Sequence, residues 1–193
     1  MNHELTTAAA ADPVSLSEAK AHLREDAADR DDEITRLVKA ATAHLDGYAG
    51  VLGRALVTQS WTLTLDSWPL AGIPLPLAPV QSITAIRYRD TNGDTQTVSA
   101  SDYRLSGSAS RPVVHLNSGG SWPTVDKNAE PIEIEYVAGY GAADEVPEPI
   151  RHAILLHVGA MYDHEKPFVT GTVVAQLPLA HDALIRPYRR VLS

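Results

Sequence analysis

The chain has 193 residues, no cysteine, and 16 basic against 24 acidic residues, which gives a formal net charge of −8. The lack of cysteine excludes disulfides, thiolate metal sites, iron–sulfur clusters and a cysteine nucleophile, and the length fits one domain or one domain with an appended module. No apolar run approaches the ~18 residues of a membrane span, and the net negative charge disfavours tight nonspecific DNA binding, which depends on phosphate neutralisation.

The first residues predict a flexible arm. Residues 1–13 are rich in Ala and Thr and end in Asp12-Pro13, and a terminus of this kind is expected to be poorly ordered. The stretch lacks the basic start and the long apolar core of a signal peptide, so we expect a cytosolic or assembled intracellular product.

A short helix is predicted directly after the arm. Ser15 and Glu18 have the spacing of a capping box, in which a hydroxyl and a carboxylate satisfy backbone amides at the start of a helix. This helix is expected to run through Arg24. Residues 25–32 contain five acidic side chains and predict a polar turn.

A longer helix follows, and its apolar pattern is the most regular in the chain. Asp31 or Asp32 is the expected N-cap, because a carboxylate suits the positive end of a helix. Gly50 is the expected stop. The apolar residues lie at steps of three and four and form one stripe: Ile34, Leu37, Val38, Ala41, Leu45 and Tyr48.

Between residues 51 and 146 the apolar period becomes that of strands. Residues 57–66 alternate, with Trp61, Leu63 and Leu65 on one face. Residues 73–77 also alternate but contain two prolines, so they fit an extended edge segment. Asn92-Gly93 predicts a hairpin turn. About six short strands are expected in all, the others being Ile83–Arg89, Thr95–Val98, Tyr103–Leu105, Val113–Leu116 and Ile132–Val137.

A third long helix is predicted from Pro147, which fits a first helical turn, to Lys166-Pro167, which ends it. Residues 168–178 have no clear period and predict a long loop. Residues 180–191 predict a short helical or extended tail. The stripe of the third helix again has steps of three and four: Ile150, Ala153, Ile154, His157, Val158, Met161 and Tyr162.

No motif points to catalysis or to a cofactor. His152 and His157 are five residues apart, which is not the i, i+4 spacing that a helix offers a metal. His157 and His164 are seven apart and can share a face near Asp163 and Glu165, but paired helical histidines are more often surface or core residues. Dinucleotide-binding and nucleophile-elbow motifs are absent from the sequence, and the three tryptophans are interpreted as core or turn residues. We expect no enzyme, no metal and no cofactor.

Charge is distributed unevenly along the chain. Residues 1–50 carry 5 basic and 10 acidic residues, and residues 147–193 carry 5 and 4. Arg186, Arg189 and Arg190 lie in the last eight residues, which contain no acid. Two interpretations remain open: a solvated acidic face with a frayed basic end, or a basic tail that docks on an acidic partner.

Seven stretches between residues 14 and 190 occur in an order and spacing that resemble one family. They are Val14–Arg24, Asp31–Ile34, Gly53–Trp61, Leu75–Val80, Ile132–Gly141, Val146–Leu156 and Leu184–Arg189. With these stretches the chain resembles the head–tail adaptor proteins of long-tailed phages and gene transfer agents, also called connector or head-completion proteins. The Ala/Thr-rich arm is a departure from the family pattern.

The resemblance implies a structural protein of the virion neck, made in the bacterial cytoplasm and without catalytic residues. Adaptors of this kind bind beneath the portal, commonly as a ring of twelve copies, and link it to the stopper or tail-completion protein. DNA is expected to pass through the ring without specific binding.

The predicted fold is α+β, with helices at the N- and C-terminal ends packed as a small bundle and a central insertion of about six short strands. We expect a flexible arm over residues 1–13 and a single adaptor domain over residues 14–190. The domain is expected to be helical over 14–50 and 147–166 and β-rich over 51–146. Residues 178–193 are expected to form a docking tail.

Two sets of residues are hypothesised to make the contacts of such a ring. One docks on the portal: Leu184, Ile185, Arg186, Tyr188, Arg189 and Arg190. The other is acidic and faces the DNA channel, where negative charge repels the DNA backbone and lets it slide: Glu25, Asp26, Asp29, Asp31 and Asp32. Residues 168–179 are hypothesised to become ordered only in the ring.

Two alternatives to a neck protein remain for the function of the chain. They are a non-viral protein-interaction module and a small hydrolase, whose convergent polar site is not found in the sequence.

Overall fold

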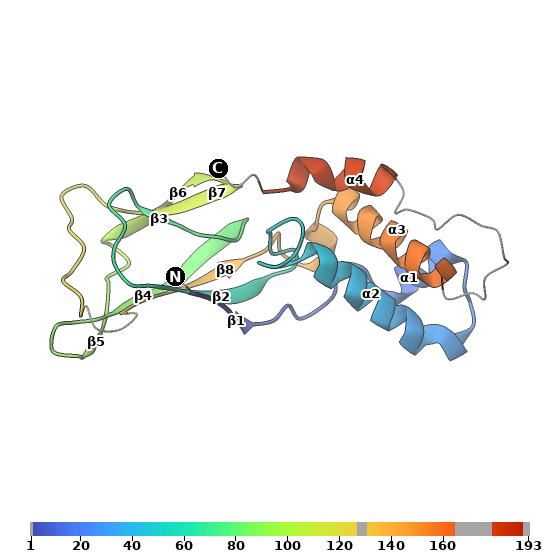
Figure 1. The fold of residues 1–193 in the computed structure, drawn as a ribbon, viewed down its shortest axis with the longest axis horizontal. Helices are drawn as coiled ribbons and strands as arrows, with labels where there is room; N and C mark the ends of the chain where they lie inside the picture. The colour runs from blue at the N-terminus through green and yellow to red at the C-terminus, as the bar shows by residue number, and fades with distance from the viewer. Residues whose placement is uncertain (1, 127–130, 165–178, 191–193) are drawn as a thin grey trace. The chain divides into compact units, whose positions relative to one another are not determined.

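The structure is a computed structural model that describes residues 2–126, 131–164 and 179–190 (Figure 1). It is an α+β fold with helices toward both ends and strands between them, as predicted. The chain divides into a β unit, Met1–Ala10 with Thr58–Tyr140, and a helical unit, Ala11–Val57 with Gly141–Ser193. The sequence predicted one domain over residues 14–190. Two units form because the helices and the strands each bury their own apolar side chains.

Helix α1 (Leu16–Leu23) begins at the predicted capping box. The Ser15 hydroxyl accepts a hydrogen bond from the Glu18 amide (3.2 Å), and the Glu18 carboxylate accepts one from the Ser15 amide (2.8 Å). Arg24 follows in the left-handed conformation, with φ of 57°. This conformation ends the helix where the sequence predicted its end.

The start of helix α2 (Asp31–Leu45) differs from its prediction. A short 3-10 turn (Ala28–Arg30) precedes the helix, and Arg30 occupies the N-cap position without a side-chain cap. The expectation that Asp31 or Asp32 is the N-cap is therefore wrong. Both carboxylates lie inside the first turn, where negative charge still suits the positive end of the helix.

The end of α2 also comes earlier than predicted. Asp46 is already extended, with φ of −85° and ψ of 151°, so the helix stops at Leu45 and the predicted stop at Gly50 is wrong. The Asp46 carboxylate accepts a hydrogen bond from the Leu56 amide at 2.7 Å, which fixes this turn of the chain. Tyr48 is consequently outside the apolar stripe and is 60% exposed.

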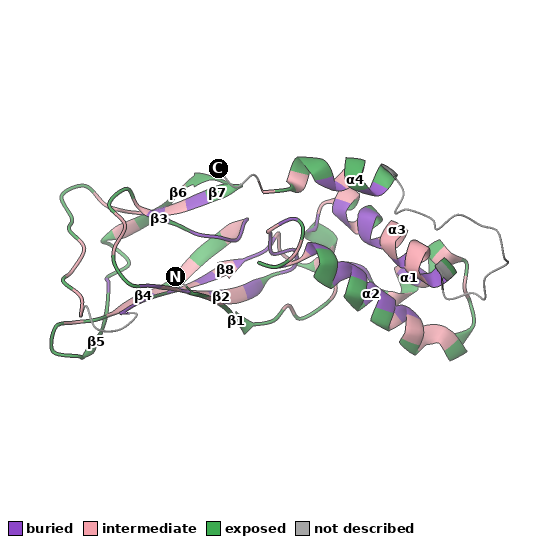
Figure 2. Cartoon of the chain, viewed as in Figure 1, coloured by how far each residue is buried: buried purple, intermediate pink, exposed green. Residues whose placement is uncertain are grey.

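Helix α3 (Glu148–His164) starts directly after Pro147, as predicted, and follows a 3-10 turn (Ala143–Glu145). It packs against α1, α2 and α4 (Leu179–Ile185), and a 3-10 turn (Arg186–Tyr188) continues α4. The predicted helix end at Lys166-Pro167 and the predicted loop over 168–178 lie outside the described residues. The core of the helical unit is apolar (Figure 2): Ile34, Leu37, Val38, Ala41, Leu45, Ile150, Ala153, Ile154, Val158, Tyr162 and Ile185.

The β unit contains two antiparallel sheets. The larger has the order β1-β2-β8-β4-β5 and the smaller has the order β3-β7-β6. Strand β2 alternates as predicted, with Trp61, Leu63 and Leu65 buried. The strands are β1 (Asn2–Thr7), β2 (Gln59–Leu65), β3 (Ile73–Pro74), β4 (Val80–Arg89), β5 (Thr95–Thr97), β6 (Tyr103–Ser108), β7 (Arg111–Leu116) and β8 (Ile132–Ala138).

The predicted flexible arm contains a strand instead. Asn2–Thr7 form β1 at the edge of the larger sheet, antiparallel to β2. The His3 ring stacks on Trp61 with centroids 4.6 Å apart, and its Nε2 lies 2.6 Å from the Tyr136 hydroxyl. The arm is ordered by these contacts with residues far along the chain, which its own composition does not reveal.

Turns and edges in the β unit follow their sequence signals. Gly93 has a φ of +88°, which glycine adopts without strain, and it closes the predicted hairpin between β4 and β5. The proline-containing segment over residues 73–77 supplies the short edge strand β3, which pairs with β7 alone.

Candidate functional site

The predicted docking tail is packed on its own helical unit. Ile185 is fully buried (0% exposed) at the end of α4, so its side chain supports the core of the subunit. Leu184, Tyr188 and Arg190 are half-buried. Arg186 and Arg189 are the exposed members of the predicted set, and Arg189 pairs with Asp182 at 2.9 Å.

A buried arginine fixes the end of the tail. Arg54 is only 6% exposed, and its Nε donates a hydrogen bond to the Tyr188 carbonyl at 2.5 Å. The Arg190 amide donates to the Leu52 carbonyl at 3.0 Å. A buried charge is costly unless it is hydrogen-bonded, so the backbone of the tail has a defined position on the helical unit.

Sequence reasoning missed the role of Arg54. The residue lies in one of the stretches that carry the family resemblance. Its position in that stretch does not indicate whether its side chain is buried. The available signal is the apolar run Ala55-Leu56-Val57 that follows it. A single arginine beside such a run is a candidate for a buried, hydrogen-bonded charge.

The loop over residues 46–53 forms the surface beside the tail. Gly53 has a φ of +59°, and a Cβ added there would lie 3.4 Å from the Arg190 Cβ, so loop and tail are in close contact. Tyr48 and Val51 on this loop are 60% and 38% exposed. Exposed Tyr and Arg side chains are typical of protein–protein interfaces, and this loop and the tail each expose such side chains, Tyr48 on the loop and Arg186 on the tail.

The predicted channel-facing acids are not all free. Lys20 pairs with Asp31 at 2.5 Å and also donates to the Ala27 carbonyl at 2.9 Å. The Glu25 carboxylate accepts a hydrogen bond from the Tyr162 hydroxyl at 2.8 Å, and this bond holds the pKa of Glu25 below its usual value. The remaining three members of the predicted set are exposed: Asp26, Asp29 and Asp32.

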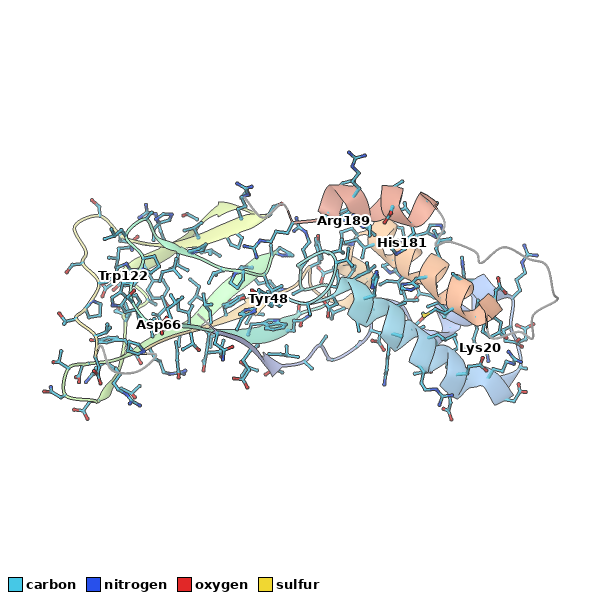
Figure 3. The ribbon with its side chains drawn as sticks, viewed as in Figure 1. Lys20, Tyr48, Asp66, Trp122, His181 and Arg189 are labelled. Atoms are coloured by element: carbon cyan, nitrogen blue, oxygen red, sulfur yellow. The ribbon has the colours of Figure 1, made fainter. Side chains whose placement is uncertain are left out.

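The acidic and basic sets do not form one site. The acidic residues lie around the N-terminal end of α2, whereas the tail contacts the loop that follows its C-terminal end. A helix of 15 residues is roughly 22 Å long. Figure 3 shows this separation, with Lys20 at one end of the helical unit and Arg189 toward the other.

Arg151 joins the N-terminal segment to α3. Its Nε donates to the Pro13 carbonyl at 3.1 Å, and its two other nitrogens contact Glu148 (2.8 Å) and Glu18. Hydrogen bonds from the Ser15 amide and hydroxyl, followed by Arg151, lower the pKa of Glu18. The capping box of α1 is therefore also its attachment point on α3.

The candidate metal-ligating residues are dispersed over the described part of the chain. Among the residues that the structure describes, no group of three or more His, Cys, Asp or Glu is arranged to hold a metal ion. His152 lies next to His22 (6.1 Å between ring centroids) and not next to His157. The side chain of His164 is outside the described residues, so the pairing of His157 and His164 is untested.

No described helix is long and apolar enough to cross a membrane.

The tryptophans pack within the β unit, as interpreted from the sequence. Trp61 is buried in β2, and Trp68 and Trp122 stack with centroids 4.4 Å apart. An open pocket of about 620 Å³ nearby is lined by Tyr88, Asp102 and mainly hydroxyl or small residues. Asp102 is the sole carboxylate in this lining, so the pocket lacks the paired acid and base of a hydrolase.

Comparison with protein-family models and with curated proteins finds no match. Solved structures match the whole chain. They include chains from the neck of an empty gene transfer agent (GTA) particle with C6 symmetry (TM-score 0.79), the virion of a native GTA particle (0.80) and the neck of a native GTA particle with C12 symmetry (0.78). Each is 26% identical, and the match covers 100% of this chain and 97% of the other.

Proposed function

We propose that this chain is a head–tail adaptor of a phage-like particle or gene transfer agent. In this role it forms a ring beneath the portal and joins the DNA-filled head to the stopper and tail. The observation that carries the proposal is the match over the whole chain to components of GTA particles, including their necks. This match supports a structural role in a virion neck and not a catalytic one.

We also propose that the ring contains twelve copies. The C12 symmetry of one matched neck supports this number. A ring requires a head-to-tail interface, in which two different surfaces of the same chain meet. Electron microscopy of the purified protein, alone and with the portal of the same genome, tests the copy number.

The portal contact is proposed to use Arg186 and Arg189 together with the loop side chains Tyr48 and Val51. All four are exposed, and they belong to the loop and the tail of the helical unit, which contact each other through Leu52 and Arg190. Ile185 contributes indirectly, because its burial holds α4 in place.

The channel lining is proposed to use the exposed acids Asp26, Asp29 and Asp32. Repeated in a ring, they place a band of negative charge around the DNA, which repels phosphates and favours sliding. Glu25 and Asp31 add less to this band, because Tyr162, Arg30 and Lys20 lie beside them.

Deleting the gene from the producing cells tests the function as a whole. We expect DNA-filled heads without attached tails, restored by the wild-type gene, and cryo-electron microscopy of restored particles is expected to show this chain in the neck. Normal tailed particles from the deletion strain would contradict an adaptor role.

A charge-reversal variant tests the docking surface. Arg186→Glu with Arg189→Glu is expected to weaken capture of the purified portal at least about tenfold, since like charges across an interface are repulsive. Arg111→Glu, an exposed arginine of the β unit, is the matched control and should retain capture. Equal capture by the double variant and the control would exclude the tail as the docking surface.

A further inference from the structure

Three histidines meet where α2, α3 and α4 come together. His44 comes from α2, His157 from α3 and His181, which is labelled in Figure 3, from α4. The ring centroids of His44 and His157 are 5.0 Å apart, those of His157 and His181 are 5.7 Å apart, and those of His44 and His181 are 6.4 Å apart. One titratable ring from each helix therefore lies in contact distance of the other two, and we term this set the histidine cluster.

Two members of the histidine cluster are poorly solvated. His181 is only 3% exposed, and His157 is half-buried. In the described structure, Nδ1 of His157 and Nε2 of His181 are buried without a hydrogen-bond partner. A neutral imidazole has one nitrogen without hydrogen, whereas a protonated one carries a donor on both nitrogens. Protonation would thus bury an N–H group without an acceptor, which is unfavourable.

The charged groups around the cluster do not offset this cost. Asp182 lies 3.8 Å from His181 Nδ1, but the same carboxylate pairs with Arg189 at 2.9 Å. Burial is the largest cause that lowers the pKa of His157, and His44 and His181 lower it further. Burial also lowers the pKa of His181, while Asp182 opposes this shift and His44 and Arg189 add to it.

We propose that the histidine cluster is a proton-sensitive latch, which holds α4 against α3 while its rings are neutral and releases α4 when they are protonated in mildly acidic solution. The neutral rings contribute packing at the joint of three helices. Protonation of His157 and His181 would bring two like charges to rings 5.7 Å apart and would bury unpaired donors.

The pH range follows from the direction of the shifts. Because folding lowers the pKa of His157 and His181, their contribution to stability is complete above the pKa of a free imidazole, about 6.5, and it is lost as the pH falls below that value. This loss of stability in acid is expected to be confined to α4. The reason is that α4 contributes the most buried ring of the cluster, His181, and is a short helix of 7 residues.

A released α4 also frees the 3-10 turn that carries Arg186. In the ring, this would change the availability of the tail for the portal, a consequence that rests on the proposed function. The latch itself does not rest on it, because all three histidines belong to the same chain.

Thiol labelling of the isolated protein tests the latch, because the natural chain has no cysteine. Ile185→Cys places a buried thiol on α4, and Ile34→Cys places an equally buried one on α2 as the matched control. Rates are normalised to those of the unfolded chain at the same pH. From pH 7.5 to pH 5.5, labelling at position 185 is expected to rise several-fold, because acid removes the contribution of the neutral rings to the stability of α4, while labelling at position 34 changes less than about twofold.

Variants that cannot titrate complete the test. His157→Gln with His181→Gln, in the Ile185→Cys background, should reduce the pH effect below about twofold, and His115→Gln in the β unit should leave it unchanged. Equal acceleration at positions 185 and 34, or an unchanged pH effect in the double variant, would overturn the proposal. If the double variant does not fold, imidazole NMR of the wild-type chain decides: His157 and His181 titrating at the ordinary histidine pKa would overturn the latch. None of these outcomes depends on the role in the neck.

Discussion

Replacing Arg54 with methionine tests whether a buried guanidinium holds the tail of the helical unit. Methionine keeps a long apolar stem and removes the charged head together with the hydrogen bonding of the guanidinium. Arg54 is 6% exposed and donates to the Tyr188 carbonyl at 2.5 Å. A hydrogen bond from a charged group contributes about 1.5–3 kcal/mol. We expect Arg54→Met to lower the free energy of unfolding of the helical unit by this amount.

Urea unfolding followed by far-ultraviolet circular dichroism measures this loss. Arg36→Met, on an exposed position of α2, is the control and should change the free energy of unfolding by less than about 0.5 kcal/mol. Replacing a buried charge by an apolar side chain is neutral in some proteins. A loss at Arg54 no larger than at Arg36 would therefore refute the reasoning that this hydrogen bond anchors the tail.

Four further changes have defined outcomes. Ser15→Ala should cost about 1 kcal/mol in urea unfolding, because it removes the cap of α1; no loss would contradict the capping role. Glu18→Gln should reduce the loss of stability in acid, because the lowered pKa of Glu18 gives stability that is present above its unfolded pKa of 4.5 and is lost as the pH falls; unfolding midpoints between pH 3.5 and 6 that follow the wild type would argue against it. Leu63→Ala in the sheet core should cost about 2–5 kcal/mol, with Thr64→Ala on the other face costing about 1 kcal/mol or less; equal losses would mean that the two faces are not distinguished. Deleting residues 2–7 should expose the edge of β2 and increase self-association in sedimentation velocity, and a sedimentation profile equal to that of the full chain would show that β1 does not protect this edge.

Elements specified by neighbouring residues were predicted correctly. The capping box of α1 depends on two residues three positions apart, and the alternation of β2 depends on successive side chains. The turn at Asn92-Gly93 depends on the left-handed conformation of one glycine. In each case the physical cause lies within a few residues, so the sequence displays it directly.

The helix ends show where local signals compete. Asp31 and Asp32 are good cap residues by type, yet a 3-10 turn places Arg30 at the cap and moves them into the first turn. Tyr48 fits the apolar stripe of α2, but the extended Asp46 removes it from the helix. Where a helix ends depends on hydrogen bonds to residues outside the helix. For α2, the Leu56 amide donates such a bond to the Asp46 carboxylate.

The sequence by itself determined the α+β class, the order of most elements, the absence of cysteine chemistry and the segregation of acidic and basic residues. Only the tertiary structure decided that β1 pairs with β2, that Arg54 is buried beneath the tail, and that His44, His157 and His181 meet. The physical reason is sequence separation. Most of these contacts join residues that lie more than fifty positions apart in the chain, and His157 and His181 lie on two different helices. No local period or spacing specifies such contacts.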